Sequence, residues 1–154
     1  EQVLPGGDLG GARDLEAFAA LPSVHAALEG VSTATAARLI ATYGSDALEV
    51  VSTADHPDTL TALAPDVPLS AAEVRYAVRH EMARTLVDIL ERRTRLACFA
   101  TESARTVAPA VAQIAASELG WDESRTQREL KVFSRQCEAR LAWRGTPRLQ
   151  KEIR

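Results

Sequence analysis

Four ionic side chains follow one another at steps of seven, four and three residues: Glu81, Asp88, Arg92 and Arg95. A continuous helix through this segment would carry them on or near one face, with Asp88 and Arg92 at the favourable i,i+4 spacing. An arginine guanidinium group donates paired hydrogen bonds to a carboxylate or to a phosphate. The pattern therefore indicates a network of ion pairs or a contact with a phosphate group.

The ionic pattern leaves two structural interpretations open. In the first, the charges are exposed to solvent, and each ion pair contributes little to stability. In the second, a buried or interface network fixes how the helices dock. Aliphatic residues between the charges favour partial burial; they are Val74, Val78, Leu86, Val87, Ile89 and Leu90.

Capping residues define the helix that would position these charges. Ser70 followed by Glu73 forms a capping box, which predicts the start of a helix over residues 72–96. We expect a break or bend in this helix between Glu81 and Thr85.

Further helices are predicted on both sides of this segment, over about residues 12–20, 33–43, 45–53 and 102–119 and after Asp122, with a short turn over 23–30. Ser32 and Asp122 are the predicted N-caps, and Gly44 and Gly120 are the matching helix ends. Pro109 predicts a kink inside its helix. No alternation of period two is present, so the predicted fold class is all-α, a compact bundle of about five to seven helices.

The residues of the ionic segment resemble a known family. Tyr76–Glu81 and Asp88–Leu96 are similar to a motif in the C-terminal domain of FAD-dependent, quinone-linked glycerol-3-phosphate dehydrogenases and alpha-glycerophosphate oxidases. Ala41–Gly44 resembles the helix end that precedes this motif, and Glu118–Glu123 resembles a later turn of the family. Leu4–Asp8 is similar to the linker that leaves the flavin-bearing part. Ordered matches of this kind are more specific than any single one.

The resemblance covers roughly residues 4–135 and implies a function for the whole enzyme. Such an enzyme oxidises sn-glycerol 3-phosphate to dihydroxyacetone phosphate, transfers hydride to FAD and passes electrons to membrane quinone. The flavin, its nucleotide-binding loop and the basic residues that bind the substrate phosphate belong to the N-terminal part of the family. We therefore expect this chain to hold no cofactor or metal and to supply no catalytic residue.

The resemblance also implies a role for particular residues as structural or interface groups; these are Tyr76, His80, Glu81, Asp88, Arg92, Arg93, Thr94 and Trp121. The expected partner is the N-terminal FAD and substrate domain of the same polypeptide. Peripheral contact with the inner face of the membrane, from a cytoplasmic location, is expected for the full enzyme. A weaker hypothesis has the Arg92 and Arg93 doublet assisting recognition of the substrate phosphate.

Three segments are predicted along the chain: a linker from the flavin domain over residues 1–11, a helical domain over 12–145 and a polar tail over 146–154. The linker contains Gly6, Gly7, Gly10 and Gly11, which favour a flexible lead-in rather than a dinucleotide loop, since the GxGxxG register fails. Residues 54–69, which are rich in proline, and those after 135 match no motif of the family that we can place.

Other kinds of chemistry find little support. His25, His56 and His80 are too scattered for a metal site, and no HExxH or Gly-x-Ser-x-Gly motif occurs. Cys98 and Cys137 lie outside any metal-binding spacing and are expected to be reduced thiols. These observations exclude an independent hydrolase or zinc site on motif grounds.

One competing motif and one charged region keep an alternative open. Residues 30–51 resemble a helix-hairpin-helix, which offers backbone N–H groups to DNA phosphates, but Ser32 replaces its second glycine and the flanks are not basic. The formal net charge is -3, which disfavours nucleic acid as a partner. Residues 123–154 are nevertheless rich in Arg and Lys and would suit an acidic partner or lipid headgroups. The alternative function is a stand-alone helical interaction or nucleic-acid-binding module.

Overall fold

The computed structural model describes residues 4 and 6–142. Within them the α-helices are α1 Leu15–Ala19, α2 Pro22–Ala27, α3 Thr33–Tyr43, α4 Ala47–Ser52, α5 Ala71–Arg79, α6 Leu96–Phe99, α7 Thr101–Leu119 and α8 Glu123–Ala142. Two 3-10 turns, Gly44–Asp46 and Pro57–Leu60, a π-helix at Asp88–Arg93 and the strands β1 Ala62–Ala64 and β2 Val67–Ser70 complete the order. The predicted mostly helical fold is confirmed.

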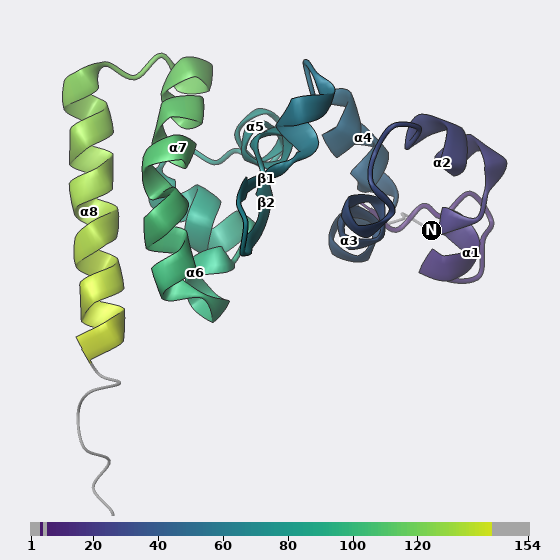
Figure 1. Ribbon diagram of the computed structural model, residues 1–154, viewed down its shortest axis with the longest axis horizontal. Helices are drawn as coiled ribbons and strands as arrows, with labels where there is room; N and C mark the ends of the chain where they lie inside the picture. Colours follow the sequence, from purple (N-terminus) through teal and green to yellow (C-terminus); the bar gives the residue numbers. More distant parts are fainter. Residues whose placement is uncertain (1–3, 5, 143–154) are drawn as a thin grey trace, which may run out of the picture.

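Helix α5 joins two halves of the molecule. Figure 1 shows α1 to α4 on one side of α5 and the strand pair, and α6 to α8 on the other. Ala72 and Tyr76 of α5 pack into a hydrophobic cluster with the N-terminal helices. Val74 and Ala77, on another side of α5, are fully buried in a second cluster with α7 and α8. One nine-residue helix therefore contributes to both cores.

The predicted helix ends explain where the main elements begin and stop. The Ser32 hydroxyl accepts from the Thr35 N–H at the start of α3, and Gly44 ends that helix with φ +61°. The Ser70–Glu73 capping box is present at the start of α5. Such caps satisfy N–H groups that a helix leaves without an internal partner.

The two long C-terminal helices also follow their predicted boundaries. Gly120 ends α7 in the left-handed conformation, with φ +66°. The Arg125 N–H donates to the Asp122 carboxylate at 2.6 Å, which caps the start of α8. Phe133 and Cys137 of α8 are buried against the C-terminal cluster. Pro109 lies inside α7, as the sequence predicted.

The structure adds a strand pair that the sequence analysis missed. β1 and β2 are antiparallel, with Ala62 opposite Ser70 and Ala64 opposite Val67. The strands hold three and four residues, too few to produce a visible alternation of period two. Pro65 and Asp66 form the turn between them, so the second half of the proline-rich segment 54–69 is a hairpin, which follows the 3-10 turn Pro57–Leu60.

The prediction of one ionic helix face is wrong, because the backbone leaves the helix after Arg79. Met82 and Arg95 adopt φ +57°, and they are the described non-glycine residues with positive φ. The predicted break between Glu81 and Thr85 is confirmed, and it extends to both ends of that interval. Glu81 and Asp88 therefore lie on different pieces of backbone rather than one face of one helix.

Residues 6–12 pack against the N-terminal half. The Ser45 N–H donates to the Gly6 carbonyl at 3.0 Å, and Leu9 and Ala12 contact the cluster around Phe18. A Cβ atom on Gly44 would lie 2.0 Å from the Gly6 carbonyl oxygen. The backbones of Gly6 and Gly44 thus approach as closely as glycine allows.

Replacing Gly44 with alanine is expected to displace residues 6–8 and to cost about 1–3 kcal/mol, the usual range for a strained backbone. Hydrogen exchange at the Ser45 amide should accelerate. Gly120→Ala is the control, since its φ is similar but nothing lies within 4 Å of the added Cβ. Equal effects of the two substitutions would contradict the proposed contact with Gly6.

Candidate docking surface

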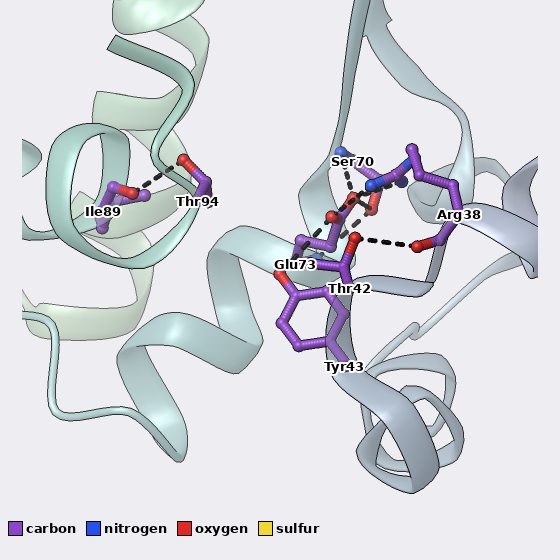
Figure 2. A network of polar contacts seen from close by, with 7 residues as sticks. All are labelled: Arg38, Thr42, Tyr43, Ser70, Glu73, Ile89 and Thr94. Carbon is purple, nitrogen blue, oxygen red and sulfur yellow. Dashed lines mark hydrogen bonds and ion pairs between the residues drawn. The ribbon is translucent and has the colours of Figure 1, made fainter. Parts of the chain in front are cut away.

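A buried carboxylate stands at the junction between the two halves. Glu73 has a side chain only 3% exposed, and Arg38 of α3 donates to its two oxygens at 2.6 and 2.7 Å. The Ser70 N–H and hydroxyl donate to one of these oxygens at 2.9 and 2.8 Å. Figure 2 shows these groups converging on the carboxylate, with Tyr43 beside them. Buried charges require such complete hydrogen bonding.

Tyrosine and histidine rings continue from this carboxylate along α5. Tyr43 packs edge-on against Tyr76 with ring centroids 5.5 Å apart, and the Tyr76 ring stacks on His80 at 4.9 Å. The Tyr76 hydroxyl donates to Asp46 at 3.4 Å. Burial raises the pKa of both tyrosines, and neighbouring carboxylates raise it further. Both phenols therefore stay neutral and bind α5 to the end of α3.

His80 and Glu81 mark the exposed end of this run. The His80 Nδ1 lies 3.2 Å from a carboxylate oxygen of Glu49 in α4. Glu81 is half-buried and makes no hydrogen bond or ion pair within the described residues. Burial raises the pKa of Glu81, Arg93 opposes this shift and Asp46 adds to it. A partly desolvated carboxylate without a hydrogen-bond donor is typical of functional surfaces.

The π-helix Asp88–Arg93 carries the remaining charged motif residues. Arg92 donates to Asp88 at 2.5 Å, as the i,i+4 spacing predicted, but the Arg92 side chain is 69% exposed. The Thr94 N–H and hydroxyl both donate to the Ile89 carbonyl, at 2.9 and 2.8 Å, and close the wide turn. π-Helical turns often occur at functional sites.

Hydrogen bonds lower the pKa of the Asp88 carboxyl. Burial alone would raise the pKa of this carboxyl, but the Thr85 hydroxyl, the Arg84 N–H and the Arg92 guanidinium outweigh burial. The pKa of Asp88 therefore lies below its ordinary value. Asp88 and Glu81 are thus shifted in opposite directions, seven residues apart.

A cleft of about 300 Å³ opens between the halves, next to the buried carboxylate. We call it the α3–α6 cleft; the residues that define it here are Arg38, Tyr43, Leu69, Glu73, Leu96 and Phe99. Thr94 of the motif also lines it, and Phe99 is 74% exposed. The Arg95 guanidinium lies 5.1 Å above the Phe99 ring centroid. Motif residues from two separate segments thus meet at one surface.

The structure divides the eight predicted motif residues into two groups. Tyr76, Asp88 and Thr94 hold the backbone of the motif through the contacts above, and Arg92 pairs with Asp88. Trp121 packs on the C-terminal cluster, where the Arg125 guanidinium lies 5.7 Å from its ring centroid. These five residues all make side-chain contacts with other described residues.

His80, Glu81 and Arg93 form the second group, because each is exposed or only half-buried at the surface. Arg93 makes no hydrogen bond or ion pair within the described residues, and its charge acts on Glu81. In the arginine doublet, Arg92 donates to Asp88 through one guanidinium nitrogen while its side chain stays 69% exposed. Arg93 is left as an exposed cation.

Sequence reasoning missed two ionic groups. It assigned Glu73 to a helix cap, but its main partner Arg38 lies 35 residues away. It also gave no role to Glu118, which binds Arg79 at 2.7 and 2.8 Å and approaches Arg75 at 3.4 Å. The i,i+4 spacing finds only pairs within one helix, so it could not detect either group.

The two carboxylates with shifted pKa values predict opposite effects of pH. Glu81→Gln should raise the free energy of unfolding at pH 7 by about 0.5 kcal/mol and change little below pH 4. The raised folded pKa favours the protonated acid, so the stabilising contribution of Glu81 is present at low pH and lost as pH rises through that pKa.

Asp88→Asn should have the opposite effect and lower the free energy of unfolding by about 1 kcal/mol at pH 7. The lowered folded pKa makes the contribution of Asp88 present above its unfolded pKa and lost as pH falls through the folded value. Urea unfolding of both variants between pH 3 and about pH 7 measures the two slopes. If the effect of the substitution on the free energy of unfolding changed with pH in the same direction for both variants, the opposite pKa shifts of Glu81 and Asp88 would be refuted.

The remaining features from the sequence analysis are a metal site, a membrane-spanning helix, the helix-hairpin-helix resemblance and the polar tail. Among residues 4 and 6–142, no group of three or more His, Cys, Asp or Glu side chains could hold a metal ion. No helix in that part of the chain is long and apolar enough to cross a membrane. In the segment that resembles a helix-hairpin-helix, Gly30, with φ +83°, turns the chain between α2 and α3. The Ser32 hydroxyl, at the position of the second glycine, accepts the hydrogen bond that caps α3. The predicted polar tail lies outside the described residues.

Comparison with known proteins gives a consistent result. The chain matches the family model described as the C-terminal domain of alpha-glycerophosphate oxidase over residues 1–126. The mitochondrial glycerol-3-phosphate dehydrogenase of Bos taurus is 36% identical over 108 residues, which is 67% of this chain and 15% of that protein. The corresponding protein of Arabidopsis thaliana is 39% identical over 101 residues, 66% of this chain and 16% of the relative.

A more extended match is found in Caenorhabditis elegans. Its probable mitochondrial glycerol-3-phosphate dehydrogenase is 36% identical over 135 residues, which cover 84% of this chain and 18% of that protein. The chain therefore spans less than a fifth of the length of these relatives. No solved structure matches.

Proposed function

Because this chain belongs to the family of C-terminal domains of alpha-glycerophosphate oxidase, we propose that it is the helical C-terminal domain of an FAD-dependent glycerol-3-phosphate dehydrogenase. The whole enzyme oxidises glycerol 3-phosphate to dihydroxyacetone phosphate and delivers the electrons to quinone. The names of the relatives and the small share of their length that this chain covers support this assignment.

The described residues do not fit an FAD site. A dinucleotide loop needs a buried strand before it and a helix directly after it. Gly6, Gly10 and Gly11 follow no described strand, and α1 begins only at Leu15. The sheet in the described part is one antiparallel hairpin. As the family resemblance implies, we place the flavin in the part of the polypeptide that precedes this domain, and we assign no reaction step to the residues of this chain.

One observation carries the proposed role: two of the guanidinium groups that could meet a phosphate, those of Arg38 and Arg92, are already paired with carboxylates. Arg38 is bound by both oxygens of Glu73, and Arg92 is bound by Asp88. A group that recognises substrate phosphate needs guanidinium donors that are not already paired. The domain thus acts as a cap that stabilises the enzyme and docks on its flavin-bearing part. Arg93 and Glu81 remain for contacts with that part.

Purification of the full-length polypeptide tests the assignment. We expect bound FAD in the full-length protein and reduction of a quinone analogue that depends on glycerol 3-phosphate. A full-length polypeptide that folds without flavin would contradict the proposal. Retention on DNA at physiological salt would instead favour the helix-hairpin-helix alternative, although the turn between α2 and α3 contains no Lys or Arg.

The location of the enzyme is a separate part of the proposal. We place it in the cytoplasm with peripheral contact to the inner face of the membrane, because electrons must reach a quinone. Cell fractionation followed by a salt wash tests this part. Recovery of the enzyme only in the soluble fraction would contradict membrane contact.

A further inference from the structure

We infer that the α3–α6 cleft is the docking site for a segment of the flavin-bearing part of the same polypeptide, a segment that inserts an apolar side chain and presents a carboxylate to Arg95. This inference rests on the proposed function, since it takes the preceding part of the enzyme as the occupant. It adds the position of the contact and the chemistry of the docking segment.

The lining of the cleft selects an apolar occupant. Leu69, Leu96 and Phe99 supply aliphatic and aromatic surface from β2 and α6. The polar groups at its inner end are already engaged, because the Arg38 guanidinium forks onto the Glu73 carboxylate. An anionic small molecule would have to break this ion pair to bind there, which is costly at a buried site. An apolar side chain leaves the pair intact.

Exposure of Phe99 indicates that the cleft is covered in the complete protein. Phe99 is 74% exposed although it lies at the end of a helix whose neighbour Ala97 is buried. Large aromatic side chains are typical anchors of protein interfaces. The position of Arg95 above the ring leaves the other face of Phe99 to contact an incoming side chain.

The charges at the cleft determine which end of the docking segment carries its carboxylate. Arg95, the residue that precedes α6, is an exposed cation whose guanidinium lies over the ring of the cleft residue Phe99. Asp66, at the tip of the hairpin, also lines the cleft and carries the opposite charge. A docking segment with its carboxylate toward α6 and away from the hairpin tip complements both ends. The reverse orientation would place like charges together.

Gly6, near the start of the described residues, lies beside the end of α3. Residue 6 contacts the end of α3: the Gly6 carbonyl accepts from the Ser45 N–H, and a Cβ on Gly6 would lie 2.5 Å from the Tyr43 carbonyl oxygen. Tyr43 itself lines the cleft. The relatives are several times longer than this chain. A segment tethered beside its docking site has a high effective concentration there.

Photo-crosslinking in the full-length flavoenzyme tests the inference. Phe99 is replaced with p-benzoylphenylalanine, which keeps an aromatic side chain at an exposed position, and the irradiated protein is digested and sequenced by mass spectrometry. We expect an intramolecular crosslink to a peptide that precedes residue 1 and contains an apolar residue beside Asp or Glu. The same probe at Val132, which is 47% exposed on α8, is the matched control and should give no such product.

Other crosslinks would overturn the inference. A crosslink from Phe99 to a second copy or to lipid, or none above the Val132 control, means that the flavin part does not cover the cleft. Arg95→Glu should abolish the expected crosslink while Arg128→Glu on α8 keeps it. Oxidation of glycerol 3-phosphate by the unmodified enzyme is measured in parallel. If the enzyme oxidises glycerol 3-phosphate but the crosslink does not reach a peptide that precedes residue 1, only the docking site is refuted. If the expected crosslink forms but the enzyme does not oxidise glycerol 3-phosphate, only the proposed reaction is refuted.

Discussion

Replacing Arg38 with methionine is expected to lower the free energy of unfolding by about 3–5 kcal/mol, the usual cost of removing one partner of a buried ion pair. The Glu73 carboxylate would stay 3% exposed and lose both donors of the guanidinium group, keeping only the hydrogen bonds from Ser70 and Tyr43. Methionine retains much of the aliphatic volume of arginine, so packing changes little. Urea unfolding followed by circular dichroism measures the loss.

Two further variants separate this effect from a general loss of packing. Arg105→Met removes a surface pair with Glu102, in which the side chains are 40% and 69% exposed, and should cost at most about 1 kcal/mol. Combining Arg38→Met with Glu73→Gln removes the buried charge but keeps a residue suited to the capping box. The double variant should be more stable than Arg38→Met alone. If Arg38→Met and Glu73→Gln lowered the free energy of unfolding additively, the ion pair between these residues would not hold the halves together.

Phe133→Ala is the second substitution with a large expected effect. Phe133 is 2% exposed and packs α8 against the C-terminal cluster. Truncation of a buried phenylalanine leaves a cavity and costs about 3–5 kcal/mol. Helix α8 lies mostly beyond residue 126, where the family match ends, so this measurement asks whether the additional helix belongs to the domain core.

The residue next to Phe133 provides the control. Val132 is 47% exposed on the same turn of α8, and Val132→Ala should change stability by no more than about 0.5 kcal/mol. Thermal unfolding of the two variants gives the comparison. A loss below 1 kcal/mol for Phe133→Ala would place α8 outside the cooperative core.

Local rules predicted the helices and most of their ends. Ser70 and Glu73, Gly44, and Gly120 with Asp122 each define a boundary through residues within three positions of one another, so one sequence is sufficient to recognise them. The motif from Tyr76 onwards was also recognised, because its residues are contiguous. Local chemistry and contiguous motifs therefore gave the fold class and the family.

Contacts between distant segments could not be predicted in this way. The pairing of Arg38 with Glu73 depends on how α3 crosses α5, and the α3–α6 cleft depends on both halves. The conformation of Met82 was also missed, since a methionine with positive φ has no sequence signature of the kind that glycine provides. The ionic residues were thus placed on one helix face that does not exist.

We propose that this domain supports the enzyme and supplies no group that touches substrate. Steady-state kinetics of the full-length enzyme with Arg92→Ala and Arg93→Ala together test this claim most directly, because these arginines are the motif residues best suited to bind the substrate phosphate. We predict an unchanged KM for glycerol 3-phosphate and an unchanged kcat at temperatures where the variant is folded. A rise in KM of about tenfold or more, the size expected on losing a charged hydrogen bond, would contradict it.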